Sequence, residues 1–344
     1  MKPIRVLIVD DSPTVQYVLK NLLASEPDIQ IVGAACDPYE AKDLIAQTAP
    51  DVITLDIEMP RMDGITFLKR LMSFQPMPVI MISSYTRENS KRTLEALNAG
   101  AFDFVAKPTG DVKTGLQTLK HEIVAKIRAA SQARIKTSAL FTQHEKPPVS
   151  ETLISASDKV IAVGASTGGT RAIHRLLAPM PSNVNGIVIV QHMPARFTKT
   201  FAQNLDAACA LDVKEAEDGD RVVRGRVLLA PGGVHLELSR DMEGYFVRLN
   251  DGKPVKYQRP SVDVLFYSVA KAARENAIGV LLTGMGNDGS DGLLAMRRGG
   301  AFTIVQNEGT SVVFGMPGAA IERGAAEVVA ALDDISGIIL AKLA

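Results

Sequence analysis

Short apolar runs alternate with amphipathic stretches along the first 125 residues of the chain. The runs are rich in β-branched residues and apolar almost throughout, which is typical of strands buried in a parallel sheet. The stretches between them repeat apolar residues at helical spacing. Five such units predict a doubly wound α/β domain. The expected strands are residues 4–9, 29–34, 51–55, 79–82 and 102–106.

Helix-start signals fall where this pattern needs them. Ser12 and Pro13 suit an N-cap and a first helical position. Asp37 and Pro38 repeat the arrangement, and Glu40 stands at the capping-box position. Both signals therefore predict helices that begin directly after the first and second strands.

A second alternation of apolar runs and amphipathic stretches follows a segment rich in proline and polar residues. Pro147 and Pro148 lie within a stretch that reads as a linker. Helical spacing over 122–131 could extend the last helix of the first domain. We expect domains at 1–125 and 157–344, joined by a linker at 126–156. The strands expected in the second domain are residues 160–163, 187–190, 227–230, 278–283 and 302–305.

The second domain is therefore expected to be a three-layer α/β structure with a mainly parallel sheet. Val262, Leu265, Phe266 and Val269 predict one of its helices. Residues 234–249 resemble a hairpin added to the sheet.

Composition and charge narrow the class of protein. Lys plus Arg and Asp plus Glu each number 38 in 344 residues, so the net charge argues against nucleic acid or an anionic membrane as the main partner. No apolar run approaches the roughly 18 residues that span a bilayer, and no signal peptide is evident. Cys36 and Cys209 form no disulfide or zinc pattern. We expect a cytoplasmic protein without membrane insertion.

Acidic residues follow two of the strands expected in the first domain. Asp10 and Asp11 end the first strand and Asp56 ends the third, so all three reach one edge of the sheet. Three carboxylates suit a hard cation such as Mg²⁺. Lys107 and Ser83 end two further strands. Each Asp alone could merely cap a helix, but the joint pattern favours a carboxylate that accepts a phosphoryl group beside a metal.

Residues 3 to about 122 resemble the flavodoxin-like receiver domains of bacterial response regulators. The resemblance implies phosphorylation of Asp56 by a histidine kinase. The residues that carry it are Val9-Asp10-Asp11-Ser12, Leu55-Asp56-Ile57-Glu58-Met59-Pro60, Met62-Asp63-Gly64, Ile82-Ser83-Ser84 and Lys107-Pro108.

The same resemblance implies the metal ligands and the switch residues. Mg²⁺ would be held by Asp11, Asp56 and the Glu58 carbonyl, with Asp10 acting indirectly. Ser83 would be the switch hydroxyl, with Ser84 as its rival, and Lys107 would contact the phosphoryl group. A cis peptide bond is expected before Pro108.

A serine, a histidine and an aspartate follow three strands expected in the second domain. Ser166 lies in a Gly-x-Ser-x-Gly turn between a strand and a helix, which exposes a nucleophile in many hydrolases. His192 and Asp288 follow two further strands, so the three residues share one sheet edge. A serine needs a base, and the base needs an orienting carboxylate. The chain order Ser, His, Asp argues against a common α/β-hydrolase.

Other interpretations of this domain stay open. His235 is a rival for the base, although a structural role is the more common one for such a residue. Gly284, Gly286 and Gly289 match a dinucleotide fingerprint, with Glu308 at the expected distance. Asp288 would repel a pyrophosphate there, and residues 287–292 read as a loop. A non-catalytic output that only binds partners would leave the serine site without a role.

The C-terminal half resembles the CheB-type protein-glutamate methylesterases of bacterial chemotaxis. The resemblance implies hydrolysis of glutamate methyl esters, and deamidation of some glutamines, on the cytoplasmic helices of chemoreceptors. It also implies that the Met285 N–H, with the Thr167 side chain, binds the oxyanion, and that this domain needs no cofactor. The matching stretches are 163–169, 191–194, 230–235, 259–263 and 282–289.

Overall fold

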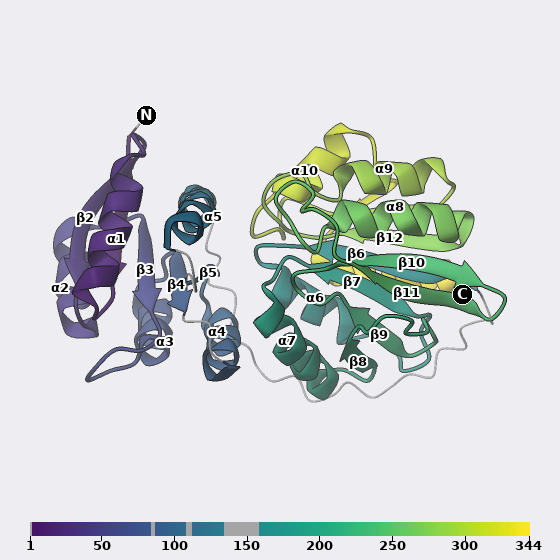
Figure 1. The fold of residues 1–344 in the computed structure, drawn as a ribbon, viewed down its shortest axis with the longest axis horizontal. Coiled ribbons are helices and arrows are strands. Elements are labelled where there is room, and N and C mark those ends of the chain that lie inside the picture. Colours follow the sequence, from purple (N-terminus) through teal and green to yellow (C-terminus); the bar gives the residue numbers. More distant parts are fainter. Residues whose placement is uncertain (1, 84–86, 108–111, 134–157) are drawn as a thin grey trace. The chain divides into compact units, whose positions relative to one another are not determined.

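The computed structural model describes residues 2–83, 87–107, 112–133 and 158–344, with side chains at 87–88 and 112–118 excepted. The described residues form two compact units, one within residues 2–133 and one within residues 158–344 (Figure 1). Each unit is described by itself.

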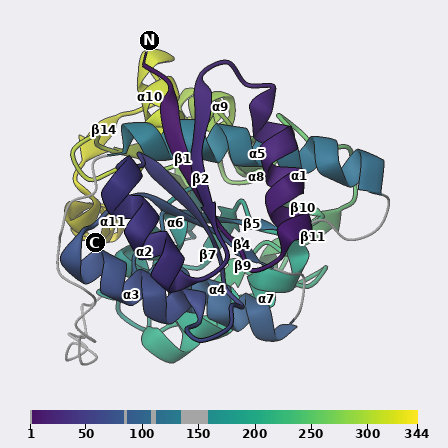
Figure 2. The same cartoon turned by 90° about the vertical axis from the view of Figure 1, so that its left-hand side faces the viewer.

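The first unit is a five-stranded parallel sheet with the order β2-β1-β3-β4-β5. Helices α1 and α5 lie on one face, and α2, α3 and α4 lie on the other (Figure 2). The predicted doubly wound fold is therefore confirmed. Its elements are β1 (Ile4–Val9), α1 (Pro13–Ala24), β2 (Ile29–Ala35), α2 (Pro38–Thr48), β3 (Val52–Asp56), α3 (Gly64–Phe74), β4 (Val79–Ser83), α4 (Arg87–Ala99), β5 (Asp103–Ala106) and α5 (Val112–Gln132).

The helix starts are confirmed at atomic level. The Ser12 hydroxyl accepts the Val15 N–H at the start of α1, and Asp37 accepts the N–H groups of Tyr39 and Glu40 at the start of α2. Each cap satisfies backbone donors that the first helical turn leaves without partners.

Helix α5 runs past residue 125, where the sequence pattern placed the end of the first domain. Ile123, Ile127 and Ala130 are buried at helical spacing. Arg128 makes ion pairs with Glu26 and Asp28 of the same unit. These contacts hold the last helical turns on the first unit, because the apolar stripe continues through them.

The second unit is built on a seven-stranded sheet with the order β14-β13-β12-β6-β7-β9-β8, and every adjacent pair is parallel. Five strands match the expected ones. The edge strands β8 and β14 were not anticipated, because β8 has only one apolar residue among its four and β14 is only three residues long. The strands are β6 (Val160–Ala165), β7 (Ile187–Gln191), β8 (Asp212–Glu215), β9 (Arg226–Leu229), β12 (Ala277–Leu281), β13 (Phe302–Gln306) and β14 (Val328–Ala330).

Helices cover this sheet, and one of them, α8, packs tightly against α9 and β10. No helix within the described ranges is both long and apolar enough to pass through a membrane. The helices are α6 (Gly169–Leu177), α7 (Ala195–Ala208), α8 (Val262–Ala272), the short 3₁₀ helix η1 (Arg274–Asn276), α9 (Ser290–Arg298), α10 (Gly315–Glu322) and α11 (Leu332–Leu343).

The hairpin forms a sheet of its own, so the expectation that it adds to the main sheet was wrong. Its strands β10 (His235–Asp241) and β11 (Gly244–Asn250) pair only with each other in the described sheets. The backbone N–H of Leu238 donates to Ser268 of helix α8 instead of to a third strand. Leu236 and Val247 are buried in one cluster with Phe266 of the same helix. The apolar face of the hairpin is thus covered by helix α8.

Phe266 and its neighbour Tyr267 provide a test of this packing. Phe266 is fully buried, whereas Tyr267 is 51% exposed. Phe266→Ala should lower the free energy of unfolding by about 3–5 kcal/mol, because it leaves a cavity between hairpin and sheet. Tyr267→Ala should cost about 0.5 kcal/mol or less. Urea unfolding followed by circular dichroism measures both, and equal losses would contradict the described core.

Candidate functional site

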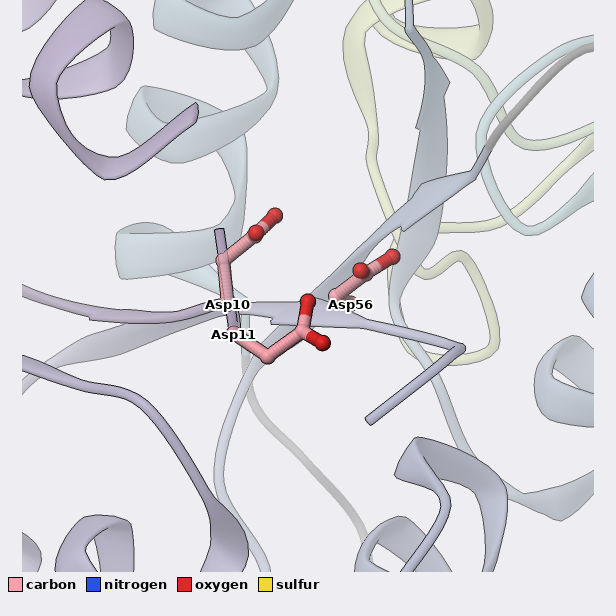
Figure 3. Close-up of side chains that lie close together, drawn as sticks. All are labelled: Asp10, Asp11 and Asp56. Atoms are coloured by element: carbon pink, nitrogen blue, oxygen red, sulfur yellow. The ribbon is translucent and has the colours of Figure 1, made fainter. Parts of the chain in front are cut away.

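Three carboxylates gather at one edge of the first sheet. Asp10 and Asp11 directly follow β1, and Asp56 ends the adjacent strand β3. One oxygen from each lies within 4.8 Å of the others (Figure 3). Asp10 and Asp56 are buried, whereas Asp11 is exposed. The fold therefore brings together the three carboxylates that the strand pattern placed at this edge.

Lys107 joins this acidic cluster from the end of β5. Its Nζ lies 3.0 Å from Asp56 Oδ2 and 3.3 Å from Asp10 Oδ2. Burial raises the pKa of Asp56 to about 6, although the Lys107 ammonium opposes that rise. Burial alone would lower the pKa of Lys107, but the two carboxylates outweigh it and raise the pKa. The cluster thus contains more acidic groups than its one lysine neutralises.

The chemistry of the cluster fits a divalent cation. Asp10 Oδ2 is buried without a hydrogen-bond partner in the described part of the chain, and its nearest cation is Lys107. Carboxylate oxygens at this spacing are the ligands that Mg²⁺ prefers. Glu58, whose carbonyl completes the expected ligand set, is exposed and lies two residues beyond Asp56.

The expected switch hydroxyl is buried and engaged. Ser83 ends β4, and its Oγ accepts a hydrogen bond of 2.7 Å from the Thr93 hydroxyl on α4. The backbone N–H of Lys107 donates to the Ser83 carbonyl at 2.7 Å. Ser83 therefore connects helix α4 with the strand that leads to Lys107. The rival Ser84 and the expected cis bond at Pro108 lie outside the described residues.

The second cluster lies at one edge of the seven-stranded sheet. Ser166 directly follows β6, His192 directly follows β7, and Asp288 follows β12 after a short loop. The three strands are neighbours, with β6 in the middle. Because parallel strands end at a common edge, residues far apart in the chain meet there.

His192 and Asp288 are in direct contact. His192 Nε2 lies 2.8 Å from Asp288 Oδ2, and both side chains are almost fully buried. The other ring nitrogen of His192, Nδ1, has no hydrogen-bond partner among the described residues. That nitrogen is therefore the one available to a neighbouring hydroxyl.

Asp288 is held charged despite its burial. Burial acts to raise the pKa of Asp288, but the hydrogen bond with His192 and the donors from Val262 and Ser261 hold the pKa below its usual value. The Val262 N–H donates to Oδ2 at 2.7 Å, and the Ser261 hydroxyl donates to Oδ1 at 2.8 Å. The Asp263 N–H donates to Oδ1 at 3.2 Å. The carboxylate thus lies at the N-terminus of α8, where the helix dipole favours negative charge.

Two residues that the sequence patterns did not single out hold the loops together. The Gln191 side-chain amide donates to the carbonyls of Ser166 and His192, at 2.9 and 3.2 Å. The Thr283 hydroxyl donates to the Thr167 carbonyl at 3.0 Å. Both are buried polar residues near the ends of apolar strands. A polar residue at the end of such a run is the sequence feature that could have indicated them.

Glycines near Ser166 allow neighbouring loops to approach closely. Gly168 has a left-handed φ of 77°, and a Cβ there would lie 2.6 Å from Val312 Cβ. A Cβ on Gly284 would lie 2.8 Å from the Cβ of Ser166. Gly289 is the left-handed N-cap of α9, which begins at Ser290. The expectation that 287–292 is a loop was therefore wrong in its second half, because glycine supplies the helix start without a side-chain cap.

The Met285 N–H fits an oxyanion donor. Met285 lies between the buried Gly284 and the exposed Gly286, and its N–H makes no hydrogen bond within the described chain. Gly284 is fixed because its carbonyl accepts the N–H groups of Gly315 and Met316. Thr167, the second expected donor, is buried beside Ser166.

The rival histidine, His235, lies close to the site but does not reach Ser166 through any described contact. Ser261 N–H donates to His235 Nδ1 at 3.2 Å, and His235 Nε2 contacts the Lys253 carbonyl at 3.1 Å. Both ring nitrogens are thus engaged with backbone.

The folds and clusters define a receiver module followed by an α/β domain with the side chains of a serine hydrolase. The profile described as "CheB methylesterase" matches residues 161–339, and "Response regulator receiver domain" matches 6–119. The chain belongs to the CheB methylesterase family, with an N-terminal receiver domain.

Relatives match over nearly the whole chain. The protein named protein-glutamate methylesterase/protein-glutamine glutaminase from Bordetella bronchiseptica is 52% identical, over 100% of this chain and 98% of its own. The protein of the same name from Syntrophotalea carbinolica is 49% identical, over 97% of this chain and 96% of its own. The Thermotoga maritima CheB methylesterase catalytic domain shares 38% identity and a TM-score of 0.53, covering 54% of this chain and 100% of that domain.

The charge of Asp288 predicts a pH-dependent contribution to stability. Its folded pKa is below the ordinary value of 3.8, so the carboxylate stabilises the fold above that pH and loses this contribution as the pH falls below it. Asp288→Asn should cost about 3 kcal/mol near pH 6 and progressively less below pH 4.

Urea unfolding at several pH values measures this difference. Asp251→Asn, at an exposed position outside helices and strands, is the control and should show no such trend. A cost of Asp288→Asn that stays constant from pH 6 to pH 3 would contradict the description of Asp288 as a buried anion.

Proposed function

We propose that this protein is a phosphorylation-regulated methylesterase that hydrolyses glutamate methyl esters on proteins and deamidates certain glutamines. The match to relatives of that name along the entire chain carries the proposal. The contact between His192 and Asp288 at the edge that also holds Ser166 supplies the chemistry. The substrates would be the cytoplasmic helices of methylated chemoreceptors, and the reaction would take place in the cytoplasm.

In the proposed reaction Ser166 is the nucleophile and His192 is the base. The hydroxyl attacks the glutamyl ester carbonyl while its proton passes to His192 Nδ1, the ring nitrogen left free by Asp288. Asp288 keeps the other nitrogen protonated and stabilises the imidazolium. The bond from the carbonyl carbon to the methoxy oxygen then breaks, and His192 returns the proton to methanol. Water hydrolyses the glutamyl-enzyme by the same proton path.

The negative charge that develops on the carbonyl oxygen needs donors nearby. The free N–H of Met285 and the side chain of Thr167 are proposed for this role. One such donor contributes on the order of 10²–10³ in rate. For a glutamine substrate the same steps release ammonia instead of methanol. This domain needs no cofactor for either reaction.

The receiver domain is proposed to accept a phosphoryl group on Asp56 from a chemotaxis histidine kinase. Mg²⁺, held by Asp11, Asp56 and the Glu58 carbonyl with Asp10 acting indirectly, would neutralise charge on the phosphoryl oxygens. Lys107, 3.0 Å from Asp56, would pair with one of those oxygens. Ser83 would respond by exchanging its bond with Thr93 for one to the phosphoryl group.

Ser166→Ala tests the proposed nucleophile. The variant should lose at least about 10³-fold in methanol release from methylated receptor, while its melting temperature stays unchanged. Ser182→Ala, at an exposed serine of the same domain, should retain full activity. An active Ser166→Ala protein would reject the serine mechanism.

The regulatory proposal predicts a difference between two altered chains. We propose that the unphosphorylated receiver restricts access of the protein substrate and that phosphorylation relieves this restriction, a bias of a few kcal/mol. Deleting residues 1–150 should raise basal methanol release and abolish the response to a small-molecule phosphodonor. Asp56→Asn in the full chain should stay at basal activity and remain unresponsive.

Methanol release by these two proteins and the full-length chain, measured side by side, decides the mode of control. A well-folded fragment that is no more active than the unphosphorylated full chain would contradict restriction. It would indicate that the phosphorylated receiver activates the esterase directly.

A further inference from the structure

His235 is a buried histidine that the proposed reaction does not use. It begins strand β10, and only 2% of it is exposed. Its Nδ1 accepts the backbone N–H of Ser261 at 3.2 Å. Because Nδ1 is an acceptor there, the ring proton must lie on Nε2, which donates to the Lys253 carbonyl at 3.1 Å. His235 is therefore held as one neutral tautomer.

The backbone that His235 binds is the backbone that holds Asp288. Ser261 is the N-cap of α8, and its hydroxyl donates to Asp288 Oδ1 at 2.8 Å. The next two N–H groups, of Val262 and Asp263, also donate to this carboxylate. A shift of residue 261 would therefore move three of the four donors of Asp288 together. The fourth donor is His192 Nε2, whereas the other ring nitrogen, Nδ1, is the one proposed to accept the serine proton.

The turn before His235 binds the segment ahead of α8 at a second point. The Gly233 N–H donates to the Arg259 carbonyl at 3.1 Å. Two hydrogen bonds, from Gly233 and to His235, thus fix the chain between Arg259 and Ser261 directly ahead of α8. An imidazole suits the second bond because it accepts on one side of the ring and donates on the other, so the turn at Ser261 is tied to Lys253 through a rigid plane.

We propose that His235 is a positioning residue of the esterase: it fixes the N-terminus of α8 through Ser261 and thereby sets the orientation of Asp288 and His192. The inference rests on the proposed esterase function and adds to it a residue that touches neither substrate nor base. Loss of His235 should therefore lower kcat and leave KM nearly unchanged. A misplaced orienting carboxylate weakens proton transfer but leaves the substrate contacts intact.

Two substitutions separate the two hydrogen bonds of the ring. In His235→Asn the amide oxygen can take the place of Nδ1 and accept the Ser261 N–H, but it cannot reach Lys253. In His235→Gln the longer amide can reach the Lys253 carbonyl but leaves Ser261 without an acceptor. Both variants remove the ring and are polar, so they share the loss of packing. The comparison therefore isolates the bond to Ser261.

The experiment measures kcat and KM for methanol release from methylated receptor, and the melting temperature, for the full-length wild type and both variants after phosphodonor treatment. We expect His235→Gln to lose about tenfold in kcat with KM within about twofold. His235→Asn should retain most of kcat, although both variants melt at lower temperatures than the wild type.

Equal kcat values for two folded variants would overturn the positioning role and leave His235 as a residue of the core. The positioning role would also be overturned if His235→Gln kept more kcat than His235→Asn, because the bond to Lys253 would then be the one that matters. A wild-type protein without ester hydrolysis would instead refute the proposed function itself, which distinguishes the two failures.

Discussion

The second domain depends on one buried negative charge. A carboxylate removed from water is costly, and Asp288 keeps its charge only because the N-terminus of α8 and His192 surround it with donors. This requirement fixes where α8 must begin and how the loop after β12 must run. The orientation of His192 is then a consequence of where the charge lies.

Both domains place their chemistry by the same rule. Parallel strands end together, so polar residues that follow different strands meet at one edge without any dedicated insertion. In the receiver the edge gathers Asp10, Asp56 and Lys107, which carry opposite charges and shift one another's pKa. In the second domain it gathers a neutral hydroxyl and an imidazole beside the Asp288 carboxylate. The fold supplies proximity, and the charge balance of each cluster determines which reaction it suits.

The sequence predicted most strands of both sheets because apolar runs and helix caps are local signals. It also predicted the residues at the strand ends, including Ser166 and His192, since alternation alone places them at one edge. It could not predict which backbone donors hold Asp288 or that Gln191 joins two loops, because those contacts join residues far apart in the chain. The hairpin was assigned to the wrong partner for the same reason: its apolar face looks identical whether a sheet or helix α8 covers it.

The pairing of β6 with β12 has a consequence for the biogenesis of the enzyme. The strand that presents Ser166 finds one of its two sheet neighbours far downstream, and the Ser166 N–H is satisfied by the Thr283 carbonyl. Such non-local pairing forms late, because the entropic cost of closing a long loop precedes the stabilising contacts between the two strands. A nascent chain that has not yet released α9 from the ribosome holds the serine loop without its aspartate. The proposed set of Ser166, His192 and Asp288 can therefore assemble only after synthesis has passed Asp288.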